Sequence, residues 1–167
     1  MGLVKQAQKG NSNAFVELIE QNKMAMYKVA KSYLYNEEDA ADAMQDTVLA
    51  VYEHIGQLKE PKYFKTWMIR ILINKCKNIL RKQSNYCPLE KGPEQVYEDH
   101  SQSDIEFFDM LRVLPEEDRM IFVLYYGAQF TVQQIAQTLD IKENTIMSRL
   151  SRGRKKIYNQ MQAIHMP

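Results

Sequence analysis

The sequence predicts an all-α protein made of two small helical domains that a flexible linker joins. The 167 residues include six Gly and five Pro, too few for the many turns of a β-protein, whereas residues that favour helix are plentiful. Apolar residues recur at helical spacing over most of the chain. Residues 83–103 lack this periodicity and contain two Pro and one Gly, which is typical of a linker. The predicted domains are therefore residues 1–82 and 104–167.

Three helices are expected in the first domain. In residues 13–35 the apolar side chains repeat with the period of a helix. The next helix covers residues 37–55, because Asn36 can cap it and acidic residues occupy its first turn, where the helix dipole favours them. A loop at residues 56–61 separates it from the third helix, at residues 63–82.

Four helices are expected in the second domain, at about residues 103–114, 115–126, 132–139 and 143–161. Two capping-box pairs, a helix-initiating Pro and a helix-terminating Gly mark their ends: Ser103 with Glu106, Thr131 with Gln134, Pro115 and Gly127. The last two helices form a predicted helix-turn-helix, with small Ala136 where the helices would cross closely.

No segment suggests a membrane or secreted protein. No apolar run approaches the ~18–20 residues of a membrane span. The first 13 residues are polar and lack the apolar core of a signal peptide. We therefore expect a cytoplasmic location.

Nothing in the residue pattern indicates catalysis. Cys76 and Cys87 have no CxxC spacing, which favours one core thiol and one loop thiol over a disulfide or zinc site. His54, His100 and His165 are scattered, and neither a catalytic triad nor a phosphate-binding glycine motif is present in the sequence. We expect no enzymatic activity, no cofactor and no metal.

The formal net charge of +1 conceals two basic regions on either side of an acidic one. Residues 1–82 carry 13 Lys/Arg and 9 Asp/Glu, a net charge of +4. Residues 83–117 carry 2 and 9, a net charge of −7, and residues 118–167 carry 7 and 3, again +4. Charge separated in this way indicates a polyanionic partner.

The expected helix at residues 63–82 has one broad apolar side and one basic stripe. Residues 59–82 hold eight basic residues and one acid, and Trp67 lies in phase with the stripe. Cations beside an aromatic ring suit the binding of a single nucleic-acid strand. The cations pair with phosphates, and each base stacked on an aromatic ring contributes ~1–3 kcal/mol to the binding free energy. A solvated basic face, with Trp67 buried against the first helix, is the alternative. The candidate strand-binding residues are Tyr63, Phe64, Trp67, Arg70, Asn74, Lys77, Asn78 and Arg81.

The expected helix at residues 37–55 is acidic, with six acids and no Lys or Arg. Beside a basic helix in a nucleic-acid-binding protein, an acidic face must point away from the nucleic acid. It is therefore either a solvated face or a surface for docking another protein. The candidate docking residues are Asp39, Asp42, Gln45, Asp46, Leu49 and Glu53.

The outer face of the last helix is basic and polar. Such a helix fits the major groove of duplex DNA, where Arg can bond guanine and Ser or Asn other base edges. The candidate base-reading residues are Asn144, Ser148, Arg149, Ser151, Arg152 and Lys155.

Three segments, in order along the chain, resemble an extracytoplasmic-function (ECF, group IV) sigma factor of the sigma-70 family. The polymerase-docking segment of that family is similar to DAADAMQDTVLAVY. The segment that recognises and melts the minus-10 element is similar to YFKTWMIRILINKCKNILRK. The domain that binds the minus-35 element is similar to LPEEDRMIFVLYYGAQFTVQQIAQTLDIKENTIMSRLSRGRKKI.

The resemblance implies two helical domains, sigma2 and sigma4, and no cofactor. The implied function is to bind core RNA polymerase and direct promoter-specific initiation in response to an envelope or extracytoplasmic signal. The implied partners are core polymerase, promoter DNA and an anti-sigma protein, and the chain itself would not insert into the membrane.

The resemblance also implies a role for each candidate face. The clamp helices of the largest polymerase subunit would contact Asp39, Asp42, Gln45 and Asp46. The melted minus-10 strand would contact Trp67, Arg70, Asn74 and Asn78, with a flipped base in loop 56–62. The minus-35 element would contact Ser148, Arg149 and Arg152. Met147 stands where the family commonly has Lys or Arg.

The linker length agrees with binding at two promoter elements. Its 21 residues, fully extended, span ~70 Å, about two turns of B-DNA.

Two other functions fit parts of the sequence: a dimeric helix-turn-helix regulator of duplex DNA, and an interaction module that sequesters another regulator. A DNA recombinase is disfavoured, because no nucleophile with supporting groups can be nominated.

Overall fold

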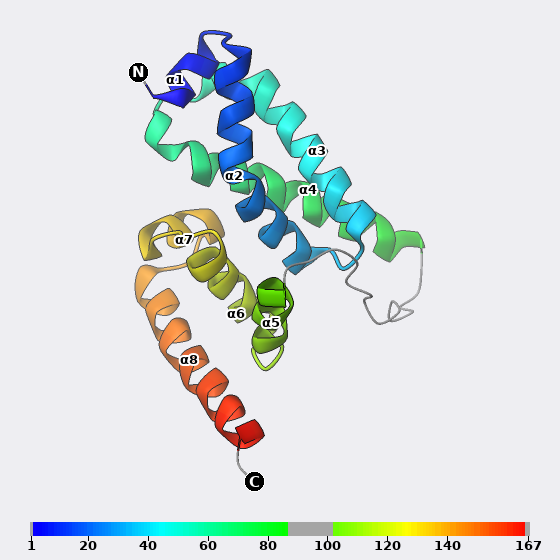
Figure 1. The fold of residues 1–167 in the computed structure, drawn as a ribbon, viewed down its shortest axis with the longest axis vertical. Coiled ribbons are helices and arrows are strands. Elements are labelled where there is room, and N and C mark those ends of the chain that lie inside the picture. Colours follow the sequence, from blue (N-terminus) through cyan, green and yellow to red (C-terminus); the bar gives the residue numbers. More distant parts are fainter. Residues whose placement is uncertain (1, 87–101, 166–167) are drawn as a thin grey trace. The chain divides into compact units, whose positions relative to one another are not determined.

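The computed structural model describes residues 2–86 and 102–165 (Figure 1). The chain divides into two compact units, Met1–Gly92 and Pro93–Pro167. Over the described ranges the regular structure is helical and contains no strand, which confirms the predicted all-α class. Most of the predicted linker, residues 87–101, lies outside the described residues.

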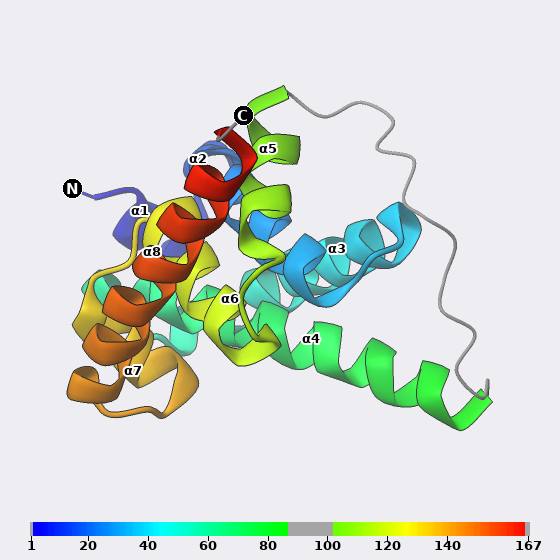
Figure 2. The ribbon, with the colours of Figure 1, turned by 90° about the horizontal axis from the view of Figure 1, so that it is seen from below.

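The described part of unit 1 is built on three long helices that pack pairwise on one another, as Figure 2 shows for α3 and α4. Its elements are α1 (Leu3–Gln8), α2 (Ser12–Tyr33), α3 (Glu37–His54), the 3₁₀ turns η1 (Ile55–Gln57) and η2 (Pro61–Tyr63), and α4 (Phe64–Tyr86). Between the three long helices lies a core that includes Met26, Val29, Ala43, Met68 and Leu72. Helix α1 was not expected, since a two-turn helix is too short for a clear apolar period.

Local signals account for where the long helices of unit 1 begin. The side chain of Asn11 caps α2 by accepting from the backbone N–H of Ala14. Asn36 caps α3 in the same way, as predicted, through the N–H of Glu38. Helix α4 runs through Tyr86, four residues past its predicted end, because residues 83–86 continue the helix before the first Pro of the linker.

An ion pair between a buried lysine and an exposed glutamate joins the end of α2 to the start of α3. Lys31 is only 6% exposed, yet its Nζ lies 3.0 Å from the Glu37 carboxylate and donates to the backbone oxygen of Tyr35 at 3.0 Å. The same carboxylate accepts a hydrogen bond from the hydroxyl of Tyr27. A buried ammonium is tolerable only with such partners, so this cluster fixes the α2–α3 turn.

The described part of unit 2 ends in a helix-turn-helix. Its elements are α5 (Gln102–Leu111), α6 (Glu116–Phe122), the π-helical segment η3 (Val123–Gly127), α7 (Val132–Leu139) and α8 (Glu143–His165). The predicted capping box of Thr131 and Gln134 is confirmed in both directions. Asp140 adopts a left-handed conformation (φ 55°) between α7 and α8, which turns the chain without Gly.

Several helix ends in unit 2 differ from the predicted ones. Gln102 is already helical, so Ser103 lies in the first turn of α5 and not at its cap, and α5 ends at Leu111, three residues before its predicted end. Pro115 is the N-cap of α6 and not its first residue. Helix α8 runs to His165, four residues past its predicted end. The helical segment that α6 begins does end at Gly127, within a residue of the prediction, but its last five residues have π geometry. Local signals place a helix end only to within a few residues, and tertiary packing decides the rest.

Candidate interaction surfaces

The predicted basic stripe exists along α4. Among its members, those exposed to solvent are Tyr63, Arg70, Asn74, Lys77, Asn78 and Arg81. Their spacing of three or four residues keeps them on one side of the helix. On the opposite side Met68, Leu72 and Cys76 are buried against α2 and α3. We call these exposed residues, together with Trp67, the α4 stripe.

The aromatic residues of the stripe differ in exposure. Phe64 is 4% exposed and belongs to the core, so the structure does not bring it onto the predicted binding face. Trp67 is half-buried and packs on the Phe64 ring, with centroids 6.1 Å apart. Tyr63 is exposed, and the Lys62 ammonium lies 4.9 Å from its ring centroid. The ring of Trp67 thus packs on a neighbour in its own helix, and part of it stays accessible to solvent.

The predicted acidic face exists along α3. Of its predicted members, those exposed to solvent are Asp42, Gln45, Asp46, Leu49 and Glu53. Leu49 is 58% exposed, and Tyr52, one turn further along α3, is 62% exposed. Asp39 differs from them, because it is half-buried and accepts a 2.6 Å hydrogen bond from Gln83 of α4.

An apolar groove runs beside the acidic face, between α2 and α3. Its volume is about 430 Å³. Two predicted docking residues, Gln45 and Leu49, line it, together with apolar and aromatic residues of α2 and α3. These further lining residues include Phe15, Ile19, Met44, Val48 and Tyr52. Acidic side chains beside an open apolar groove fit an amphipathic basic helix.

The outer face of α8 carries most of the predicted base-reading residues. Its exposed members are Asn144, Ser148, Ser151, Arg152 and Lys155. The inner face is buried through Ile146 and Leu150, which meet α7 and α6. Ser148, Ser151 and Arg152 line one shallow hollow with Met147, which is 52% exposed.

Arg149 lies apart from the other predicted residues of α8. Its guanidinium pairs with Glu117 at 3.3 Å and with Asp118 at 3.7 Å, both in the first turn of α6. Its side chain is 25% exposed. The structure therefore joins Arg149 to α6 and does not place it on the face shared by Ser148 and Arg152.

Two family models match the chain, each on one unit. Sigma-70 region 2 matches residues 18–86, and sigma-70 region 4 matches residues 104–157. The chain is 26% identical to the RNA polymerase sigma factor SigV of Bacillus subtilis (strain 168), covering 87% of this chain and 90% of SigV. It is 24% identical to the ECF RNA polymerase sigma factor SigW of the same organism, covering 95% and 94%. The chain belongs to the ECF group of the sigma-70 family.

Two solved structures share the fold of this sigma factor. One is CnrH in complex with the cytosolic domain of CnrY, with a TM-score of 0.71, 23% identity and 96% of both chains covered. The other is the sigma factor RpoE in complex with the anti-sigma factor NepR from Bartonella quintana, with a TM-score of 0.70, 21% identity and 89% and 96% covered.

Family membership gives the general function of this sigma factor. It binds core RNA polymerase and directs transcription initiation at promoters, so core polymerase and promoter DNA are its partners. Sigma factors are regulators of transcription. The alternative of a dimeric helix-turn-helix regulator is thereby set aside. Among the described helices, none is both long and apolar enough to span a membrane.

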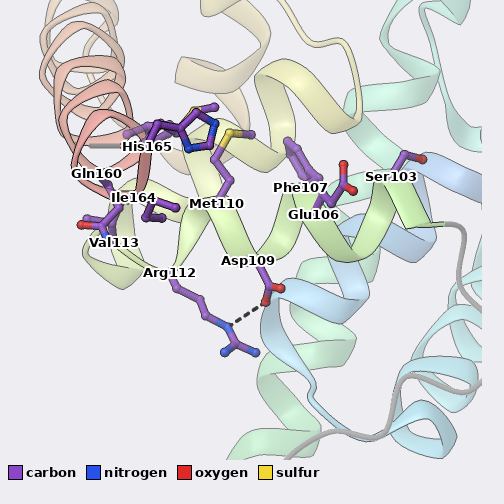
Figure 3. Close-up of a pocket in the computed structure, with 12 residues that line it drawn as sticks. Ser103, Glu106, Phe107, Asp109, Met110, Arg112, Val113, Gln160, Ile164 and His165 are labelled. Atoms are coloured by element: carbon purple, nitrogen blue, oxygen red, sulfur yellow. Dashed lines mark ion pairs between the residues drawn. The ribbon is translucent and has the colours of Figure 1, made fainter. Parts of the chain in front are cut away.

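A second apolar groove lies in the sigma4 unit, between α5 and the end of α8 (Figure 3). It measures about 940 Å³ and is lined by Phe107 and Met110 of α5 and by Val113 of the turn that follows α5. Figure 3 shows Met110 and Val113 beside Ile164 of α8, whereas Arg112 points away and pairs with Asp109 at 3.2 Å. The end of α8, after residue 157, lies beyond the region 4 match. The helical pattern of the sequence did not predict this groove.

Cys76 is confirmed as a core thiol. It lies on the buried side of α4, and burial raises its pKa to about 12. The thiolate is therefore inaccessible at neutral pH, which fits a structural role. Cys87 lies outside the described residues.

Proposed function

We propose that each of three exposed faces of this sigma factor binds a different partner. The acidic face and groove of α3 dock on the clamp helices of the polymerase. The α4 stripe and loop 56–62 hold the melted minus-10 strand, and the outer face of α8 reads the minus-35 duplex. The observation that carries the proposal is the separation of acidic from basic faces within unit 1: α3 contributes no Lys or Arg, and the exposed charges of the α4 stripe are positive.

Charge decides which face of sigma2 meets nucleic acid. The phosphates repel the acids of α3 and attract the Lys and Arg of α4. A strand lying along α4 can pair its phosphates with Arg70, Lys77 and Arg81. It can also stack a base on Tyr63 or on the accessible part of Trp67.

The composition of the α8 face suits base readout in the major groove. Arg152 can form paired hydrogen bonds with a guanine, and Ser148 and Ser151 can reach other base edges. Met147 adds an apolar surface that fits a thymine methyl group. Helical phase alone could have identified Met147, since it is one residue from Ser148 on the outer side. Arg149 does not belong to this face, because Glu117 and Asp118 of α6 hold its guanidinium.

The signal that controls this sigma factor would arise outside the cytoplasm, whereas the sigma factor itself acts in the cytoplasm. We propose that an anti-sigma protein restrains it, with RpoE bound to the anti-sigma factor NepR as the structural precedent. The two uncovered apolar grooves, one in each unit, are the surfaces that an apolar helix of such a protein would cover. An envelope signal would then release the sigma factor.

Runoff transcription tests the proposal. Core polymerase, this chain and a library of genomic promoter fragments should yield transcripts that share two sequence elements. The elements should be separated by about two turns of DNA, and the transcripts should be absent when the chain is omitted. Transcripts from random positions, or none, would contradict promoter recognition.

A further inference from the structure

Helix α1 holds the loop between α3 and α4 through one side chain. The amide Nε2 of Gln8 donates to the backbone oxygen of Ile55 at 2.9 Å and to that of Leu58 at 2.7 Å. Ile55 is the first residue of η1, and Leu58 is its C-cap. One side chain therefore bridges the two ends of this turn, across some 50 residues of sequence.

The geometry uses the whole donor capacity of the Gln8 amide. An amide nitrogen carries two hydrogens, and here each is directed to a different carbonyl. The loop adds one bond of its own, from the N–H of Leu58 to the oxygen of Ile55 at 3.2 Å. Beyond Leu58 the backbone is extended at Glu60 before η2 begins at Pro61. The shape of the turn thus depends on a residue outside it.

The position of α1 agrees with a supporting role. Helix α1 packs against α2 and contacts η1, and Figure 1 shows α1 next to the segment that joins α3 to α4. Gln8 is only half-buried, so the packing of the core alone does not require an amide side chain at this position. The region 2 match begins at residue 18 and does not include α1.

We infer that Gln8 is a positioning residue for loop 56–62, which it holds in the shape that takes up an unstacked base of the minus-10 strand. The inference rests on the proposed function of that loop. Gln8 itself does not contact the base. It acts through the two carbonyls, which fix where the exposed residues Gly56, Gln57 and Lys59 stand.

The test compares Gln8→Met with Gln102→Met in reconstituted holoenzyme. Met keeps the length of Gln but removes both donors. Gln102 is an exposed residue of α5, in unit 2, whose amide donates to the Glu106 carboxylate one turn away in the same helix. Affinities are measured for a single-stranded minus-10 oligonucleotide and for a series in which each base in turn is replaced by an abasic residue.

Gln8→Met is expected to weaken binding of the intact oligonucleotide by roughly threefold to tenfold, the value of one or two net hydrogen bonds. It should not weaken binding of the oligonucleotide that lacks the base held by the loop. Gln102→Met should match the wild type on every oligonucleotide. Because each variant is compared with itself on two ligands, any unfolded fraction cancels from the ratio.

Two results would overturn the inference. One is equal weakening on the intact and on every abasic oligonucleotide, which means that Gln8 supports the fold in general. The other is no weakening at all. Failure of the proposed function looks different, because wild-type holoenzyme would then bind the minus-10 and a scrambled oligonucleotide equally well.

Discussion

Gly153 of α8 packs closely on Phe122 of α6, and replacing Gly153 with Ala tests the packing of sigma4. An added Cβ would lie 2.5 Å from Cε2 and 2.6 Å from Cζ of Phe122, and 3.4 Å from Cδ2 of Leu114. Phe122 is 2% exposed, so its ring cannot swing aside. Either the ring or the whole of α8 must shift.

The expected free-energy change has two opposing parts. Overpacking a core costs about 1–3 kcal/mol, whereas Ala stabilises a helix interior over Gly by roughly 0.5–1 kcal/mol. We expect Gly153→Ala to lower the free energy of unfolding of sigma4 by about 1–2 kcal/mol. For a domain of this size, that corresponds to a decrease in Tm of about 4–8 °C per kcal/mol.

A double-mutant cycle with Phe122→Leu separates this clash from other effects. Leu lacks the ring atoms that the new Cβ would meet, so the added methyl group fills the space that the ring leaves. The double variant should be more stable than the sum of the single effects predicts, by about 1–3 kcal/mol.

Urea unfolding of the full chain, followed by far-UV circular dichroism, measures the cycle. Trp67 is the single Trp and lies in unit 1, so its fluorescence serves as an internal control that should not change. The effects of Gly153→Ala and Phe122→Leu adding within about 0.5 kcal/mol would refute the reasoning.

The remaining predictions concern docking, readout, the core thiol and the ion pair of Lys31. Charge reversal at Asp42 and Asp46 should weaken binding to core polymerase with helicity intact, whereas reversal at Glu17, an exposed acid on α2, should not; equal core affinities would exclude the α3 face. Arg152→Ala should cost about 1–3 kcal/mol at one minus-35 base pair and relax the preference there, whereas a uniform loss over all sequences would make Arg152 a phosphate contact. In a Cys87→Ser variant at pH 8, a thiol reagent should modify Cys76 only after unfolding, and rapid labelling of the folded protein would contradict its burial. Because burial raises the folded pKa of Cys76 from 9.0 to about 12, the protonated thiol favours the folded state; this stabilisation should be complete below pH 9 and be lost as the pH rises to about 12. Glu37→Gln should lower the stability of unit 1, because it leaves the buried ammonium of Lys31 without its carboxylate, as the Trp67 unfolding transition would report.

Much of the fold follows from local sequence. The caps Asn36 and Thr131 start helices at the predicted residues, because a side chain that accepts from the first free N–H groups acts within three residues. Periodicity also placed most of the predicted exposed residues of α3, α4 and α8 correctly, since a helix fixes the direction of each side chain relative to its neighbours. It was wrong for Phe64, which is buried in the core. Helix α1 and the π geometry of residues 123–127 were not predicted, because both segments are too short to show a period.

The sequence by itself determined the all-α class, the helix-turn-helix and which side of each long helix faces solvent, all of which depend on residues close together in the chain. Only the tertiary structure decided what lies across from a given side chain. Helical phase put Arg149 near the base-reading face, but Glu117 and Asp118 of α6 hold its guanidinium. Phase likewise could not show that Gln8 reaches the carbonyls of Ile55 and Leu58. Such partners are set by how helices pack, and periodicity within one helix carries no information about that.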